Sequence, residues 1–219
     1  YMYIMGGQDY NLVEVPNSDW PDCPPLPPGA PPIPCLPSIQ VPFSNFFNDV
    51  WRSADGISWE NLTQGIGENE IWSGRAGLSA VVLDGYIYVM GGSQNDDCSI
   101  IPGGCPPGAP PPRKYFNDVW RSKDGKKWEK VLDEAPWKKR AGGIAVVKDG
   151  YMYMIGGEEG FTCDDPTRPC PPYFNDVWRS KNGKDWELMT SDAEWSKRPG
   201  HPYSGSQRGW DQLGSGCGT

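Results

Sequence analysis

The sequence has few of the histidines and none of the C-x2-C cysteine pairs that are typical of zinc sites, and it has none of the segments that cross membranes. Its only histidine is His201, and no two of its seven cysteines are spaced as C-x2-C. A protein zinc site needs several such ligands, so we expect no metal site and no bound cofactor. No run of 18 apolar residues is present, and we therefore expect no transmembrane helix. No charged and apolar signal peptide begins the chain, which predicts a mature or truncated start.

Clusters of positive charge are missing as well. The 28 Asp and Glu residues outnumber the 20 Lys and Arg residues, and the net charge is −8. Proteins that bind nucleic acids usually present a basic face, whereas no basic cluster here exceeds a few residues. Charges alternate around Trp128 within residues 123–130, which is typical of a solvated hairpin. We therefore expect no nucleic-acid partner.

Glycine, proline and aromatic residues are abundant. The chain contains 28 glycines and 24 prolines, about twice their share in an average globular protein. Its 11 tryptophans and 10 tyrosines favour strands and supply large apolar surfaces. With 22% charged residues, the composition is not that of a disordered chain. It predicts many turns joined by extended segments.

Three motifs each occur three times along the chain. The heptapeptide Phe-Asn-Asp-Val-Trp-Arg-Ser is identical in its copies at residues 47–53, 116–122 and 174–180. A Tyr-x-Tyr segment that ends in Gly-Gly occupies residues 1–7, 86–92 and 151–157. An arginine follows a tryptophan by three residues at Arg75, Arg140 and Arg198. Such repetition indicates a protein assembled from equivalent units.

One complete unit has the pattern of four short strands. Residues 76–83 are small and apolar, and Asp84-Gly85 favours a tight turn in which both residues take a positive φ. Aromatic and aliphatic residues alternate over 86–90, which predicts a second strand. The third and fourth strands are expected at residues 118–122 and 127–132. Four short antiparallel strands in each repeat are typical of one blade of a β-propeller.

The apolar strand, the Asp-Gly turn, the Tyr-x-Tyr strand, the double glycine and the spaced tryptophan together resemble the kelch repeat. This resemblance covers most of the chain outside three insertions. It implies an all-β, kelch-type β-propeller of four-stranded antiparallel blades, with about three blades present. The Ser-x-Asp-Gly-x-x-Trp hairpins at residues 53–59 and 122–128 also resemble, one residue shorter, the Asp-box turn of sialidase-type propellers. In both families such hairpins are structural.

The repeats divide the chain into four parts. Residues 1–64 form a partial kelch blade with strands two to four, and residues 65–133 and 134–191 form whole blades. Residues 192–219 begin a further blade and end in a Gly/Ser-rich tail. Propellers need about four to eight blades to close. The chain is therefore either a fragment, which its start within a repeat favours, or a unit that associates with other chains to complete a ring or a filament.

Three insertions, all between the double glycine and the Phe-Asn-Asp motif, contain six of the cysteines. The cysteines form the local pairs Cys23/Cys35, Cys98/Cys105 and Cys163/Cys170. We expect three disulfides and hence an oxidising compartment. Cys217 is left over and is either free or paired outside this chain. With the glycosylation sequon at Asn61, this pattern predicts an extracellular or cell-surface protein.

In kelch-type propellers, the loop between the second and third strands projects from the face that many members use for binding. All three insertions occupy this loop. Two of them share a proline-rich Pro-Gly-Ala-Pro-Pro phrase, at residues 28–32 and 107–111. Such segments adopt the stiff polyproline II form, which loses little entropy on docking. The insertions are either a recognition or assembly surface or passive protease-resistant loops, and their prolines are open to hydroxylation and glycosylation.

The repeated arginines have two interpretations. In a ring, equivalent positions converge around the axis, where Arg75, Arg140 and Arg198 would together bind a carboxylate or another anion. Alternatively, each arginine braces a neighbouring blade. The second interpretation is favoured because the residue recurs in every repeat, whereas a functional site is usually built once on a fold.

Aromatic residues outside the repeats are the better candidates for ligand contacts. Trp20 and Trp210 break the repeat pattern, whereas the repeated tryptophans are expected to pack between blades. His201 occupies a position that often carries histidine in kelch repeats. Without a positioned serine, cysteine or second histidine, it does not make a catalytic set.

Two hypotheses for function follow. The first is a non-catalytic extracellular propeller that binds proteins, including copies of itself or further blades, or scaffolds a matrix, coat or surface appendage through its disulfide-pinned loops. The second is a carbohydrate-active propeller with part of its site outside this chain. It would resemble galactose oxidase or sialidase, or act as a lectin that binds glycans. One histidine does not suffice for a copper site of the galactose-oxidase kind.

Overall fold

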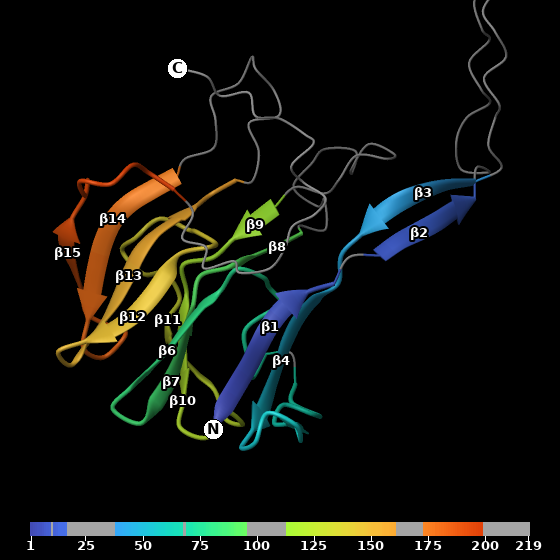
Figure 1. The fold of residues 1–219 in the computed structure, drawn as a ribbon, viewed down its shortest axis with the longest axis horizontal. Coiled ribbons are helices and arrows are strands. Elements are labelled where there is room, and N and C mark those ends of the chain that lie inside the picture. Colours follow the sequence, from blue (N-terminus) through green and yellow to red (C-terminus); the bar gives the residue numbers. More distant parts are fainter. Residues whose placement is uncertain (10, 17–37, 68, 96–112, 161–172, 199–219) are drawn as a thin grey trace, which may run out of the picture.

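The structure is a computed structural model that describes residues 1–9, 11–16, 38–67, 69–95, 113–160 and 173–198. Every regular element within these ranges is a β-strand (Figure 1). In this part of the chain, no helical segment has the length and apolar character needed to cross a bilayer. The predicted all-β class is therefore confirmed.

Three antiparallel sheets lie side by side (Figure 1). The first sheet has the order β1–β4–β5, formed by Met2–Gln8, Phe46–Ser53 and Glu60–Asn61. The second sheet has the order β6–β7–β10–β11, formed by Ser79–Leu83, Tyr86–Met90, Val119–Ser122 and Glu129–Leu132. The third sheet has the order β12–β13–β14–β15, formed by Ile144–Lys148, Tyr151–Glu158, Tyr173–Ser180 and Trp186–Thr190. Two four-stranded blades and a partial one confirm the expected kelch-type propeller, whereas the domain boundaries at 64, 133 and 191 stay predictions.

Two further hairpins extend the connection between second and third strands. The first joins β2 (Asn11–Pro16) to β3 (Ser38–Phe43), and the second joins β8 (Ser93–Asn95) to β9 (Arg113–Tyr115). Figure 1 shows both hairpins at the upper end of the sheets, where the C-terminal end of β13 and the start of β14 also lie. We call this end the insertion face. The proline- and cysteine-containing parts of the insertions lie outside the described residues.

The tight turns at the opposite end follow from the Asp-Gly pairs. Asp84 and Gly85 have φ values of 49° and 75°, and Asp149 and Gly150 have 52° and 73°. Two successive positive φ values define the turn that matches the twist of a two-residue hairpin. These pairs connect the first and second strands of the second and third sheets, and the turn at Asp84-Gly85 lies where the sequence predicts it.

The Ser-x-Asp-Gly hairpins are held by their own side chains. Ser53 Oγ accepts a hydrogen bond from the backbone N–H of Gly56 at 2.8 Å, and Asp55 Oδ1 accepts bonds from the N–H groups of Ile57 and Ser58, both at 2.8 Å. The two backbone donors and the Ser53 hydroxyl lower the pKa of Asp55 to about 2. The corresponding serines, and Asp124 or Asn182, repeat this pattern in the other sheets. These bonds fix the hairpins in the same conformation in all three sheets.

The hydrophobic core lies between adjacent sheets. One buried cluster joins the first sheet to the second and includes Val50, Trp72, Val89 and Trp128. A second cluster joins the second sheet to the third and contains Trp137. Trp72 meets Trp128 edge to face with ring centroids 4.5 Å apart, and Trp137 meets Trp186 in the same way at 5.9 Å. Trp72, Trp128, Trp137 and Trp186 thus pack between blades, where edge-to-face contacts add to apolar burial, whereas Trp195 is 40% exposed.

The double glycine allows neighbouring sheets to approach closely. Gly91 and Gly92 have φ values of 66° and 100°, which favour glycine. A Cβ atom on Gly91 would lie 2.9 Å from the carbonyl oxygen of Arg140, and one on Gly92 would lie 2.9 Å from Cδ of Arg75. The Gly92 N–H donates to the same Arg140 carbonyl at 2.8 Å. The motif therefore places the arginine-bearing segments against the ends of the sheets.

Candidate functional site

Arg75 connects the first sheet to the second. Its backbone belongs to the first sheet, because its N–H donates to Phe47 O at 3.0 Å and its carbonyl accepts from Gly7 N at 2.9 Å. Its guanidinium, only 1% exposed, donates to both carboxylate oxygens of Asp118 at 2.5 and 3.1 Å and to Gly91 O at 3.1 Å. Burial lowers the pKa of Arg75, and the bonds and charge of Asp118 oppose this shift.

Arg140 repeats the arrangement between the second and third sheets. Its N–H donates to Phe116 O at 3.0 Å, and its guanidinium donates to Asp176 at 2.7 and 2.8 Å and to Gly156 O at 2.8 Å. Burial by itself would raise the pKa of Asp176, but the bonds and charge of Arg140 outweigh it and the pKa is lowered. Arg75 and Arg140 each have a carboxylate of their own, which favours the brace over a shared anion site.

Arg198 has the same backbone contacts but an exposed side chain. Its N–H donates to Phe174 O at 3.3 Å, and its carbonyl accepts from Gly157 N at 3.4 Å. Its guanidinium bonds within the described residues only to Ser196, through the backbone carbonyl at 3.1 Å and the hydroxyl at 2.7 Å. It occupies the brace position of the third repeat, but its guanidinium reaches no other sheet within the described residues.

The other predicted site residues fall into two groups. Outside the described residues lie His201 and the predicted contact and cysteine residues, namely Trp20, Trp210, Cys23, Cys35, Cys98, Cys105, Cys163, Cys170 and Cys217. Asn61 is described: it is half-buried in β5, and its Oδ1 accepts bonds from the N–H and the hydroxyl of Thr63 at 2.9 and 3.1 Å. Its glycosylation stays a prediction.

A polar cluster that the sequence does not predict lies at the insertion face. It joins Arg113 and Tyr115 of β9 to Glu158 at the end of β13. The Tyr115 hydroxyl donates to Glu158 Oε2 at 3.4 Å, and the Gly160 N–H donates to the same oxygen at 2.5 Å. Arg113 Nη1 donates to Ser93 Oγ at 3.2 Å. We call Arg113, Tyr115 and Glu158 the Glu158 cluster.

The electrostatics of the Glu158 cluster are unusual. Burial raises the pKa of Glu158 to about 7, against the opposing bonds from Gly160 and Tyr115 and the charge of Arg113. Burial and the charge of Glu158 also raise the pKa of Tyr115. A buried carboxyl that titrates near neutral pH is able to exchange a proton with a bound ligand. The cluster is therefore the strongest candidate for chemistry among the described residues.

The Glu158 cluster is unique to one interface. In the repeat alignment, Gln8 and Ser93 occupy the positions of Glu158, and Ser44 and Pro171 those of Arg113. The sequence interpretation missed it because Tyr115 and Glu158 are far apart along the chain and both lie where the repeat gives way to an insertion. Among the described residues, no group of three or more His, Cys, Asp or Glu side chains is placed to hold a metal ion.

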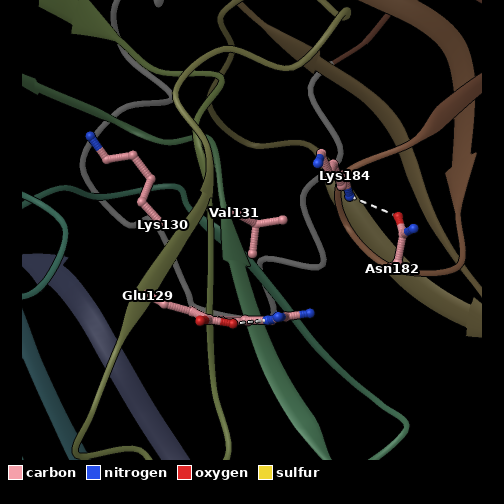
Figure 2. Close-up of a pocket in the computed structure, with 6 residues that line it drawn as sticks. Glu129, Lys130, Val131, Asn182 and Lys184 are labelled. Carbon is pink, nitrogen blue, oxygen red and sulfur yellow. Dashed lines mark hydrogen bonds and ion pairs between the residues drawn. The ribbon is translucent and has the colours of Figure 1, made fainter.

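A shallow cavity of about 270 Å³ lies at the outer edge between the second and third sheets (Figure 2). It is lined by Arg121, Glu129, Lys130, Val131, Asn182 and Lys184. Figure 2 shows Glu129 and the neighbouring arginine side chain joined by an ion pair, and Lys184 bonded through its backbone to Asn182. The Arg121–Glu129 pair recurs at Arg52–Glu60 and Arg179–Glu187, so it belongs to the repeat.

Comparison with known proteins supports the repeat assignment. The family model described as the Kelch motif matches residues 74–101. No curated protein sequence matches the chain significantly. Among solved structures, one titled "Structure of YjhT" is similar, with 17% sequence identity and a TM-score of 0.48. The similarity covers 69% of this chain and 47% of that one, so the chain spans about half the length of that protein.

Proposed function

We propose that this kelch-repeat β-propeller is a non-catalytic extracellular module that binds or scaffolds other proteins through its insertion face. The observation that carries the proposal is that repeated residues make the contacts between sheets, whereas unrepeated segments extend from one end of the array. At the two interfaces between the described sheets, the repeated residues are engaged in contacts between sheets, through Arg75–Asp118 and Trp72–Trp128 at one and through Arg140–Asp176 and Trp137–Trp186 at the other. The unrepeated hairpins β2–β3 and β8–β9 extend together from one end of the array (Figure 1).

The sequence of the insertions supports the remaining parts of the proposal. Proline-rich segments closed by local cysteine pairs are stiff, so they lose little entropy when a partner docks. Paired cysteines and a glycosylation sequon are consistent with an oxidising extracellular environment. In many proteins, a rigid scaffold of regular sheets carries loops of different sequence at one end, and these loops form the binding surface.

Replacing the loops tests the proposal. Asn95 pairs with Arg113 and Pro16 pairs with Ser38, so an Asn-Gly turn can replace residues 96–112 or 17–37 without breaking either hairpin. Each replacement also removes a complete cysteine pair. We expect the fluorescently labelled chain to bind extracellular material of its source cells, and both loop replacements to lose at least tenfold in affinity.

The control is Ile57→Ser, an exposed residue of the hairpin that connects β4 to β5, outside the insertions. This variant is expected to bind like the original chain. Unchanged binding by both loop replacements, after circular dichroism has shown that they are folded, would refute the proposal.

A carbohydrate-active propeller is the second candidate, and the Glu158 cluster is the observation that favours it. A tyrosine hydroxyl bonded to a carboxyl with a pKa near 7, beside an arginine, combines a potential nucleophile, a proton acceptor and an anion-binding group. Turnover of a fluorogenic aryl sialoside tests it. Activity lost in Tyr115→Phe and Glu158→Gln but kept in Tyr151→Phe, at the other end of β13, would replace the leading proposal. No turnover by the original chain would exclude this substrate class.

A further inference from the structure

Side chains join the base of the β8–β9 hairpin to the sheets on either side of it. Toward the first sheet, the guanidinium carbon of Arg113 lies 5.5 Å from the centroid of the Phe46 ring in β4. Toward the third sheet, the Tyr115 hydroxyl donates to Glu158 Oε2 at 3.4 Å. Residues 96–112 connect the two strands of this hairpin, so both contacts hold the second insertion at its base.

The two contacts differ in their dependence on pH. Phe46 and Tyr115 occupy equivalent positions at the start of the third strand of their repeats. Ser93 and Glu158 are also equivalent, because each directly follows a double glycine. The first interface therefore has uncharged residues where the second combines a hydroxyl with an ionisable carboxyl. Since the Arg113 guanidinium is always protonated in proteins, only the contact with the third sheet changes its charge with pH.

The carboxyl of Glu158 is buried. It is 2% exposed, and burial of an ionised carboxyl is unfavourable unless hydrogen bonds and opposite charge compensate. The Tyr115 hydroxyl, the Gly160 N–H at 2.5 Å and the charge of Arg113 favour the ionised form. The exposed Glu159 carboxylate opposes it. Burial is the largest of these effects, and it raises the pKa of Glu158 to about 7.

The other groups around Glu158 keep their charge near neutral pH. Tyr173 of β14 lies opposite Glu158 in the sheet, and Ala141 exchanges two backbone hydrogen bonds of 2.9 Å with it. Burial and the charge of Glu158 raise the pKa of Tyr115, so its hydroxyl remains protonated and remains a donor. Ionisation of Glu158 is therefore the change in this cluster that accompanies a shift from acidic to neutral pH.

Hydration of an ionised Glu158 requires that one of the covering elements moves. Glu158 itself belongs to β13, which lies between β12 and β14 in a four-stranded sheet. In the described part of the chain, β8 and β9 form a two-stranded sheet with three residues in each strand. An isolated two-stranded hairpin is marginally stable at best. The β8–β9 hairpin is therefore the covering element that moves at the lowest cost.

We propose that protonated Glu158 holds the β8–β9 hairpin against the third sheet, and that ionisation of Glu158 releases the hairpin and lets water reach the carboxylate. The sign follows from the raised pKa. A carboxyl with a higher pKa in the held state than in the released state favours the held state at low pH. This preference is lost as pH rises from about 4.5 to about 7. The inference goes beyond the function proposed for the insertion face and does not depend on it.

Hydrogen–deuterium exchange of the β8 and β9 amides at pH 5 and pH 8, corrected for intrinsic exchange rates, tests the proposal. A pKa of about 7 in the held state and 4.5 in the released state predicts a loss of protection on the order of a hundredfold. Glu158→Gln has the shape of the protonated carboxyl and cannot ionise, so it should keep its protection at both pH values. Glu159→Gln changes the exposed neighbour and is the matched control, which should still show the loss.

Exchange at low urea concentrations separates release of the hairpin from unfolding of the whole chain. Urea promotes an opening in proportion to the surface that the opening exposes. The β8 and β9 amides should therefore respond weakly to urea, whereas the amides of the buried Met152 and Met154 in β13 should respond strongly. Three results would each overturn the proposal: a loss of protection below tenfold in the original chain, an equal loss in Glu158→Gln, or equal urea responses of the hairpin and β13.

Discussion

Replacing Arg140 by methionine removes the positive half of a buried ion pair between the second and third sheets. Arg140 is 1% exposed, and it bonds to both oxygens of Asp176 and to Gly156 O. Methionine keeps an unbranched apolar stem that can still pack against Phe174, whose ring centroid lies 4.3 Å from the guanidinium carbon. The substitution therefore strands the Asp176 carboxylate without removing most of the apolar contact.

The expected cost follows from that stranded charge. Removing one partner of a buried ion pair costs about 3–5 kcal/mol, because the other charge stays buried without compensation. A chain of this size loses about 2–4 °C in melting temperature for each kcal/mol. Arg140→Met should therefore lower the melting temperature by about 6–20 °C. The double variant R140M/D176N should lose less than the sum of the two single variants, because no charge is left unpaired.

Arg179→Met is the matched control for this measurement. Arg179 also forms an ion pair, with Glu187 at 2.8 Å, but both side chains are solvent-accessible. Exposed pairs contribute about 0–1 kcal/mol, so its melting temperature should fall by less than about 4 °C. Thermal unfolding followed by circular dichroism compares the two variants. Equal effects of R140M and R179M would refute the bracing role of Arg140.

Three further results are expected. In urea denaturation, Gly92→Ala should lower the free energy of unfolding by at least about 1 kcal/mol more than Gly85→Ala does. Both glycines have positive φ, but a Cβ atom would contact other atoms within 4 Å only at Gly92. Glu158 has a folded pKa of about 7, against 4.5 for its ordinary value, so its contribution to stability is lost as pH rises from about 4.5 through 7. Denaturation at pH 4.5 and 7.5 should show this loss in the original chain and not in Glu158→Gln. A thiol reagent should label one of the seven cysteines in the unfolded, unreduced chain and all seven after reduction, whereas seven labels before reduction would exclude the disulfides.

The repeats made most of the fold predictable from the sequence. The Asp84-Gly85 pair fixes a two-residue turn because both residues adopt positive φ, so the strands on either side follow from the turn. Trp72 and Trp137 recur at a constant offset, and residues that recur in every unit are those that build the contacts between units. The same argument favoured the brace for Arg75 and Arg140.

The Glu158 cluster was not predictable in the same way. Tyr115 and Glu158 meet because β9 and β13 belong to neighbouring units, and no periodicity relates the two positions. The raised pKa of Glu158 depends on burial at an interface, which a sequence pattern does not encode.

Footprinting tests the assignment of binding to the insertion face most directly. Hydroxyl-radical labelling would be measured on the free chain and on the chain bound to extracellular material of its source cells. The account predicts protection of β2–β3, β8–β9 and Tyr115, with unchanged labelling of Ile57 and of the turns at residues 84–85 and 149–150. Protection of those turns, with the insertion face still labelled, would contradict it.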